Sequence, residues 1–552
     1  MNPSGRSELT GVGVGQGIAI GEAVRMPDPL PEPGAEPLSG DPAAEKERVA
    51  KALAAVAAEL GRRSEAAEGP AKEVLDAQAM MAQDPSIAEE AGSRIDAGMN
   101  GERAVFEAFG AFRELLVSMG GYMAERATDL GDVSQRVVAE LRGVPAPGVP
   151  QRAEPFILIA HDLAPADTAQ LELGKVLALV TRDGGPSSHT AILARDRSLP
   201  AVVGVAGADG IAEGQTLIVD AARGLVVADP SDDELAEART AQEALASVAD
   251  TPLEPGALAD GTPVQILANV GKPADTARAV ELGAEGVGLF RTEFLFLDAA
   301  EAPSVEEQTR TYTELLQAFP GKKVVARVLD AGADKPLAFL TDREEPNPAL
   351  GLRGIRVLRA HEQILRDQLT ALANAQAASE AELWVMAPMI ADAEESEYFT
   401  GLCRELGIKV AGSMIEVPSA AVLCEQILAS SDFVSVGTND LTQYTLAADR
   451  LLGTVATMQD PWHPAVLRML RLIGEAGERT GKPIGVCGEA AADPALAVVL
   501  VGLGVKSLSM TPAAFAGVRA ALREVTLDEA RARAQAACDT TSAAEAREAA
   551  RG

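Results

Sequence analysis

Eight apolar strand candidates alternate with helical patterns from about Val264 onward, and this feature constrains the fold most. In order they read VQILANV, GVGLFRT, KVVARVLD, LWVMAPMI, VAGSMIEV, FVSVGTND, PIGVCGE and VKSLSM. Eight β/α repeats over about 300 residues are typical of a TIM (β/α)8 barrel. The sequence therefore predicts such a barrel for residues 261–552, with a fraying helix at its end, SAAEAREAARG.

Polar side chains fall near the C-terminal ends of these strand candidates, where barrel enzymes place their chemistry. They are Asn269, Arg291, Arg327, Glu416, Asp440 and Cys487. The pattern predicts a functional site at this end of the barrel.

The first half of the chain predicts three further parts. Short apolar runs at both ends of the region predict an α/β domain made of residues 1–30 and 145–230. Between them, residues 31–144 are rich in Ala, Glu and Arg with helical spacing of apolar residues, which predicts an inserted helical bundle. The charged, alanine-rich residues 231–260 suit a linker helix.

Length and charge narrow the class of protein. A chain of 552 residues is too long for one hydrophobic core. Its formal net charge of −33 disfavours binding to nucleic acid or to an anionic membrane. No leader pattern or spanning run is present, and the four cysteines lack disulfide or zinc spacing, so we expect a cytosolic protein.

His189 lies in TRDGGPSSHTAILAR, where a Gly-Gly turn leads into an expected helix start. Backbone N–H groups at a helix start bind phosphate, and an imidazole nitrogen is a nucleophile, so a phosphohistidine is one interpretation. In the alternative, Ser187 or Ser188 caps the helix and His189 is structural. The motif by itself leaves both open.

Many segments together resemble one family. GQGIAIG, DAQAMMAQDP, YMAERATDLGDVSQRV, TRDGGPSSHTAILARDRSLPAVVG, GVGLFRTEFLF, NPALGLRGIR, GSMIEVPSAA, GTNDLTQYTLAADR and GVCGEAA are all similar to segments of enzyme I of the bacterial phosphotransferase system. The resemblance covers almost the whole chain. It implies a swivelling phosphohistidine domain, a helical domain that binds a carrier protein, and a barrel that binds phosphoenolpyruvate.

The resemblance also implies the reaction and its partners. His189 takes phosphate from phosphoenolpyruvate and passes it to a histidine of the small phosphocarrier protein HPr, the first step of sugar uptake. The family's substrate arginines match Arg291, Arg327 and Arg353, and bidentate guanidinium groups suit carboxylate and phosphate. We expect a cytoplasmic homodimer that associates through its barrels.

Six further residues receive roles from the same resemblance. Glu416 and Asp440 match the ligands of Mg²⁺, which prefers carboxylate oxygens, although these carboxylates could instead pair with the arginines. Asn439, Lys335 and Arg450 could add hydrogen bonds to phosphate or metal-bound water. Cys487 matches the proton donor to pyruvate enolate, whereas the default for a lone cysteine is a small buried residue.

Two departures and two rivals qualify this interpretation. Pro186 and Ser187 replace the usual pair before Ser-His, which makes phosphate positioning the point to test, and Gln16 stands where proline is common. Pyruvate phosphate dikinase and phosphoenolpyruvate synthase share the histidine and barrel motifs, but no GxxxxGK[ST] loop for ATP appears here. A non-catalytic scaffold would have lost some of the matched residues.

Overall fold

The structure is a computed structural model. It describes residues 6–15, 17–28, 30–66, 70–119, 121–150, 152–163, 171, 174–185, 188–197, 199–249, 254–297, 299, 301–332, 337, 339–340, 345–450, 452, 455 and 458–551. The chain divides into two compact units, Met1–Thr240 and Ala241–Gly552. No helix among the described residues is long and apolar enough to cross a membrane.

The first unit contains an eight-stranded sheet with the order β1-β8-β7-β3-β4-β5-β6-β2. Its strands are β1 Ser7–Thr10, β2 Val12–Val14, β3 Ile18–Arg25, β4 Phe156–Ala160, β5 Val176–Thr181, β6 Ala201–Val203, β7 Thr216–Asp220 and β8 Leu225–Ala228. The central strands β3 to β6 are parallel, and β4 is buried throughout. The α/β expectation is confirmed, although the strands SELT (β1) and LVVA (β8) were not predicted.

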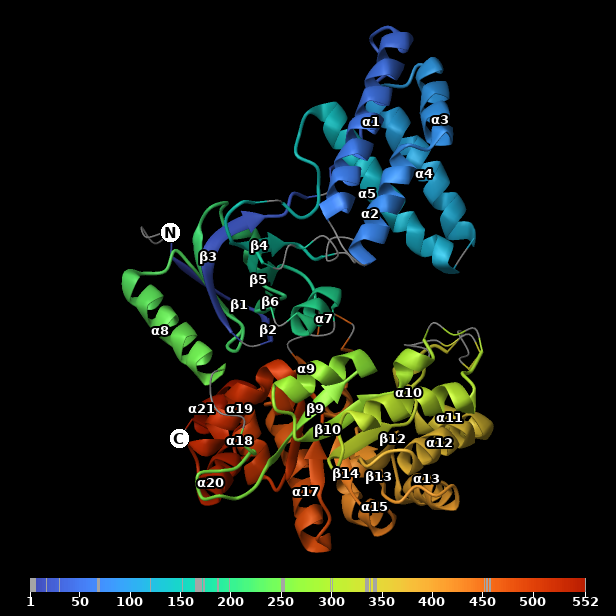
Figure 1. Ribbon diagram of the computed structural model, residues 1–552. Helices are drawn as coiled ribbons and strands as arrows, with labels where there is room; N and C mark the ends of the chain where they lie inside the picture. The colour runs from blue at the N-terminus through green and yellow to red at the C-terminus, as the bar shows by residue number, and fades with distance from the viewer. Residues whose placement is uncertain are drawn as a thin grey trace. The chain divides into compact units, whose positions relative to one another are not determined.

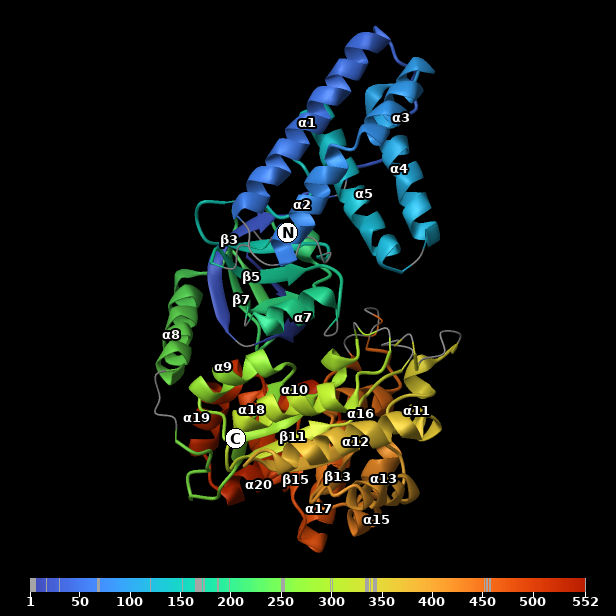
Figure 2. The ribbon, with the colours of Figure 1, turned by 45° about the vertical axis from the view of Figure 1, so that its right-hand side comes forward.

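Five helices between β3 and β4 form the inserted bundle, which Figure 2 shows side by side. They are α1 Pro42–Ala66, α2 Pro70–Ala82, α3 Pro85–Asp96, α4 Gly101–Met119 and α5 Gly121–Arg142. Their facing sides bury an aliphatic core that includes Leu60, Ile95 and Val133. Asp84 caps α3 by accepting the N–H of Ser86, with Pro85 at the first helical position. The predicted helical domain is present.

Helix α7, His189–Asp196, begins at the histidine that the sequence singled out, and α8 spans Asp232–Ala249. The Ser188 Oγ accepts the N–H of Ala191 at 3.2 Å, so Ser188 caps α7. Helix α8 begins with three acidic residues and packs Leu235 and Ala238 against the sheet. It is the helix predicted for the linker region.

The second unit is built on a closed barrel of eight parallel strands, in the order β10 to β16 and then β9 (Figure 1). The strands are β9 Gln265–Val270, β10 Gly286–Arg291, β11 Lys323–Arg327, β12 Glu382–Ile390, β13 Ala411–Ile415, β14 Val434–Val436, β15 Ile484–Val486 and β16 Ser507–Met510. All eight predicted strands are confirmed.

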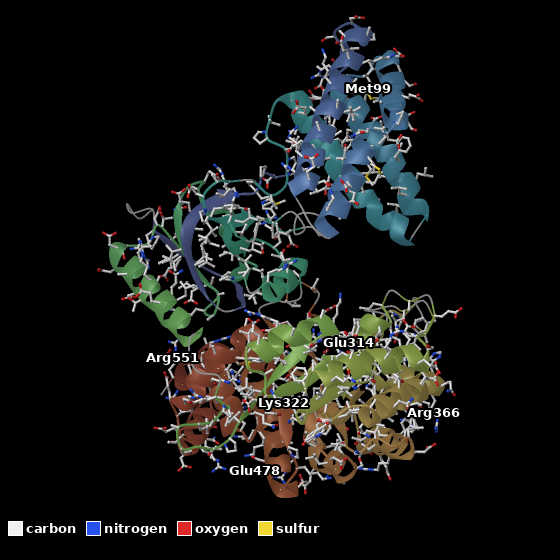
Figure 3. The ribbon with its side chains drawn as sticks, viewed as in Figure 1. Met99, Glu314, Lys322, Arg366, Glu478 and Arg551 are labelled. Carbon is white, nitrogen blue, oxygen red and sulfur yellow. The ribbon has the colours of Figure 1, made fainter. Side chains whose placement is uncertain are left out.

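Helices surround the barrel and bury its outer core. They are α9 Thr276–Glu281, α10 Val305–Gln317, α11 Ile355–Ala360, α12 Glu362–Ala377, α13 Ala393–Glu405, α14 Pro418–Val422, α15 Cys424–Ser430, α16 Thr438–Leu446, α17 Pro464–Thr480, α18 Pro494–Gly502, α19 Phe515–Arg523, α20 Leu527–Cys538 and α21 Ala543–Ala549. Charged side chains such as Arg366 and Glu478 point outward from them (Figure 3).

The C-terminal segment differs from the expectation of a fraying helix. Ser542 caps α21, Ala546 is fully buried, and Arg547 makes a two-pronged ion pair with Asp460 at 2.6 and 2.8 Å. Arg547 also lies over the Trp462 ring. These contacts hold the helix against the barrel, because tertiary packing outweighs the weak propensity of a terminal segment.

Candidate functional site

Strand alternation decides which side chains enter the barrel interior. Paired positions such as Arg327↔Met386, Met414↔Ser435, Ser435↔Gly485 and Leu289↔Asn269 belong to one inward-facing set. At the carboxyl end this set finishes with polar residues. They are Asn269, Arg291, Arg327, Glu416 and Cys487, and Asp440 joins them from the first turn of α16.

Arg327 is a buried guanidinium held by two carboxylates. It donates to Glu293 Oε1 and lies 3.2 Å from Asp330 Oδ2, while Glu416 Oε1 is 4.0 Å away. Burial opposes its charge, but the three acidic neighbours outweigh that effect and raise the pKa of Arg327 above its ordinary value. The side chain is therefore a fixed cation facing the barrel interior.

Arg353 is also buried, and it bridges two aspartates. It donates to Asp330 at 3.1 and 3.2 Å, to Asp440 at 2.9 and 3.3 Å, and to the Tyr444 hydroxyl at 3.3 Å. Burial again opposes the charge, and Asp330 and Asp440 more than compensate, raising the pKa of Arg353. Arg450 adds a contact to Asp440 Oδ2 at 3.3 Å.

Glu416 is also buried, but its negative charge is less well offset by nearby arginines than the charges of Asp330 and Asp440. Its Oε2 accepts the N–H of Met389 at 2.9 Å, and Met389 has a left-handed backbone with φ 60°, an uncommon conformation that clusters at functional sites. A Cβ on Gly437 would lie 2.6 Å from Glu416 Oε1, so only glycine leaves room for this carboxylate. Burial, Asp440 and Asp330 raise the pKa of Glu416 to about 7.

The remaining matched residues lie around this cluster. Arg291 ends β10 and stays exposed; the surrounding protein and the charge of Arg327 lower its pKa from the ordinary value. Asn439 Oδ1 accepts the N–H of Glu489 at 3.2 Å. The cluster thus offers an exposed guanidinium beside buried ones.

Cys487 follows β15 and is 2% exposed. Its thiol donates to the Val436 carbonyl at 3.5 Å and is hydrogen-bonded to the Ser435 side chain. Asn269 donates to the Cys487 carbonyl at 3.2 Å. Burial raises the pKa of Cys487 to about 11, so the group is a thiol at neutral pH and holds a proton at the edge of the charged cluster.

Two acidic residues of the cluster were missed by the sequence reasoning. Asp330 joins Arg327 to Arg353, and Glu293 is the closest partner of Arg327. Both lie within segments quoted above, GVGLFRTEFLF and KVVARVLD, so position after a strand was a signal for each. Asp440 pairs with Arg353 and Arg450, as the alternative to metal binding predicted.

The residues fit a divalent cation. Among the described residues no group of three His, Cys, Asp or Glu has the arrangement of a complete metal site. Glu416 nevertheless lacks a short ion pair, and repulsion from Asp440 and Asp330 helps to raise its pKa. Two hard carboxylates with unbalanced negative charge suit such an ion.

The structure says less about the remaining predicted positions. The backbone places His189 at the start of α7, but its side chain lies outside the described residues, as do Lys335, Pro186, Ser187 and Gln16. Next to His189, Thr190 donates to Asp162 Oδ1 at 2.8 Å, which ties the start of α7 to the loop after β4. The predicted helix start is confirmed.

Family models match most of the chain. Three family models match: the PEP-utilising enzyme PEP-binding domain over residues 246–527, the N-terminal domain over 10–126 and the mobile domain over 152–224. The solution structure titled Enzyme I (nEIt) covers 43% of this chain and 98% of its own, at 29% identity and a TM-score of 0.38.

Curated relatives match over nearly the full length. The phosphoenolpyruvate-protein phosphotransferase of Streptomyces coelicolor is 52% identical over 98% of both chains. The protein of the same name from Bacillus subtilis is 37% identical over 95% of both, and that of Haloferax volcanii is 40% identical over 86% of both. By its sequence, this chain belongs to the phosphoenolpyruvate-protein phosphotransferase family of PEP-utilising enzymes.

Proposed function

We propose that this protein is a transferase that takes a phosphoryl group from phosphoenolpyruvate onto His189 and passes it to HPr. Family membership supports the reaction, and one structural observation supports the site. Buried Arg327 and Arg353, exposed Arg291 and the Cys487 thiol converge at the carboxyl end of the barrel. A substrate with a carboxylate, a phosphate and a carbon that must gain a proton needs this combination.

The arginines bind and orient the substrate. Arg291 has solvent access and can meet an incoming anion, whereas Arg327 and Arg353 are held in place by Glu293, Asp330 and Asp440. Fixed guanidinium groups pair with both carboxylate and phosphate oxygens without reorganisation at the moment of reaction. Arg450, Asn439 and Lys335 would add hydrogen bonds at the same end.

Mg²⁺ is the divalent cation we propose, held by Glu416 and Asp440, where it would supply neutralising charge for the phosphoryl group. Asp440 would then exchange part of its contact with Arg353 for the ion. The chemical steps belong to the chain's own residues. The His189 imidazole forms a bond to phosphorus as the bond to the enol oxygen breaks, and the Cys487 thiol gives its proton to the enolate methylene carbon.

Transfer to the carrier requires the same imidazole to meet a second partner. His189 and the helices resembling carrier-binding segments precede residue 230, whereas the substrate residues follow residue 264. Met80, Leu115 and Val117 are large apolar residues exposed on α2 and α4, a surface suited to a small protein. We infer a swivelling motion of the domain that carries His189, a homodimer joined through the barrels, and a cytoplasmic setting.

The testing experiment is incubation of the protein with labelled phosphoenolpyruvate, Mg²⁺ and a histidine-containing carrier, followed by mapping of acid-labile phosphate. Label on the peptide that contains His189, then on the carrier, is expected. A fragment of residues 1–250 should exchange label with phosphorylated carrier and should not react with phosphoenolpyruvate. Direct labelling of the fragment by phosphoenolpyruvate would overturn the two-site mechanism.

A further inference from the structure

A small pocket lies inside the barrel on the amino side of the charged cluster. Its volume is about 20 Å³, and its lining includes Lys323, Trp384, Phe433, Ser435, Gly485 and Ser507. Lys323 is the first residue of β11, and Ser435 is the middle residue of β14. The pocket therefore extends from the amino end of the strands toward their middle.

Small residues leave this space open. The paired positions Ser435↔Gly485 and Gly485↔Ser507 join three neighbouring strands, whereas barrel interiors are usually filled by bulky branched residues. A Cβ on Gly485 would lie 2.8 Å from the Ser507 Oγ, so a larger side chain would close the gap. Apolar and polar side chains both line this space, and its size is enough for about one ordered water, which needs roughly 10–15 Å³.

Three serines line this space, and one of them, Ser509, donates to Asn269 Oδ1 at 2.7 Å; the other two are Ser435 and Ser507. Ser507 is 9% exposed and lines the pocket. A hydroxyl can donate one hydrogen bond and accept others, so a water molecule in the pocket is a natural partner for it. Ser435, on the same pocket wall, is hydrogen-bonded to the Cys487 thiol. The pocket is thus one hydroxyl away from the proposed proton donor.

Lys323 links the amino end of the pocket to solvent. Its Nζ donates to Gln265 Oε1 at 2.6 Å, and Gln265 is exposed. The ammonium also lies 4.8 Å from the centre of the Trp384 ring. Burial lowers the pKa of Lys323 to about 8, near the range in which an amine both gives and regains protons in neutral solution.

We propose that Lys323, a water molecule in this pocket and Ser435 form a proton relay that reprotonates Cys487 from the amino end of the barrel. This inference rests on the proposed function. After the thiol S–H bond breaks and the enolate C–H bond forms, the thiolate takes the Ser435 hydroxyl proton. Ser435 takes a proton from the water, the water takes one from the Lys323 ammonium, and Lys323 regains a proton from solvent. The net result is that one proton from solvent is incorporated into pyruvate.

The relay meets a need of the proposed reaction. Reactants bound at the carboxyl end exclude bulk water there, which protects the phosphoryl group but also blocks direct return of a proton to the thiolate. Burial makes the Cys487 thiolate unfavourable, so a rapid supply of protons keeps the donor ready. The alternative is that the pocket is only a packing gap beside a structural lysine. Substitutions of Ser435 and Lys323 distinguish a relay from such a gap.

The test measures exchange of the pyruvate methyl protons for deuterium. Full-length protein is incubated with pyruvate and Mg²⁺ in D₂O, and the methyl signal is followed by NMR. Ser435→Ala and Lys323→Met are each expected to slow exchange at least about tenfold. Ser413→Ala is the matched control, because its hydroxyl is buried on the neighbouring strand but bonded to Ser396 and Ser431 instead of lining the pocket.

Rescue gives a readout that a structural role would not produce. Ammonium chloride at constant ionic strength is expected to speed exchange in Lys323→Ala and to have no effect in Cys487→Ser. Circular dichroism checks folding, and Ser507→Ala replaces Ser435→Ala if the latter fails to fold. Wild-type exchange in the serine and lysine variants, with exchange lost in Cys487→Ser, would overturn the relay alone. Full exchange in Cys487→Ser would overturn the proposed role of the thiol.

Discussion

The α/β domain and the barrel differ in where they place charged side chains, on the surface in the first and also in the interior in the second. Among its described residues, the part of the α/β domain between 145 and 230 buries no charged side chain; its ion pairs, such as Arg182 with Asp183 and Asp209, are partly exposed. The barrel buries Glu293, Asp330, Arg353 and Asp440 together. A histidine that must meet two partners needs access, whereas a substrate with two anionic groups needs fixed counter-charges.

The contrast also has an energetic meaning. Exposed ion pairs contribute little to stability because water screens them and side-chain entropy opposes them. Buried ions are costly to desolvate. They are tolerated where each charge is paired and hydrogen-bonded, or where the site needs the charge for its function. The raised pKa of Glu416 indicates that the arginines of the cluster do not fully offset the negative charge of its carboxylates. The barrel site is thus prepared for a ligand, in contrast to the surface pairs of the first unit.

The largest expected effect is at His189. His189→Ala should abolish labelling of the protein by phosphoenolpyruvate and transfer to HPr, since the nucleophile is removed. His161→Ala is the matched control, because His161 lies in the same domain between Asp28 and Asp209. Acid-labile label on the His189 variant would contradict the assignment.

The next effect is at the barrel carboxylates. Glu416→Ala and Asp440→Ala should each lower the rate of phosphoryl uptake by about a hundredfold to a thousandfold, because charge stabilisation of this kind is worth about 10²–10³ per group. Titration calorimetry with Mg²⁺ should show weakened binding as well. Glu425→Ala, which removes an exposed carboxylate paired with Arg479, should behave as wild type.

Arg353→Lys tests the geometry of the buried cation. One ammonium cannot contact Asp330 and Asp440 with the planar fork of a guanidinium, so KM for phosphoenolpyruvate should rise roughly tenfold and thermal stability should fall. Steady-state kinetics and calorimetry measure these changes. The control is Arg359→Lys on an exposed pair with Glu394. Unchanged kinetics in both variants would argue against a substrate role for Arg353.

Lys323 gives a pH-dependent stability effect. Burial lowers its pKa from 10.5 to about 8, so the unfolded chain binds more protons between these values. The stabilisation is present above pH 10.5 and is lost as pH falls through about 8. Relative to Lys323→Met, the wild type should therefore gain up to about 3 kcal/mol of unfolding free energy between pH 8 and pH 10.5, at about 1.36 kcal/mol per pKa unit. Parallel stability curves would contradict this expectation.

The smallest effect is expected for the surface pairs of the α/β domain. Arg182→Ala removes contacts to Asp183 and Asp209, and the melting temperature should change by about 1 °C or less because exposed pairs contribute little. Differential scanning calorimetry measures the shift. A fall of several degrees would erase the contrast between the two regions.

The sequence by itself determined much of the architecture. Alternating apolar runs located the eight barrel strands, and a Gly-Gly turn followed by Ser188 located the start of α7 at His189. These features are local, since hydrophobic period and capping act over a few residues. The short strands β1 and β8 and the packing of the predicted C-terminal helix α21 were not foreseen, because each depends on neighbours distant in sequence.

Only the tertiary structure decided which charged side chains pair with one another. Arg353 and Asp440 are 87 positions apart, and barrel closure alone brings them to 2.9 Å. The same closure turns Lys323 inward beside Trp384 and leaves the pocket next to Ser435. A register shift in β10 between Val287 and Phe290 further sets which side chains face inward. Local sequence specifies each strand, but the partner of a buried charge depends on how eight strands close in space.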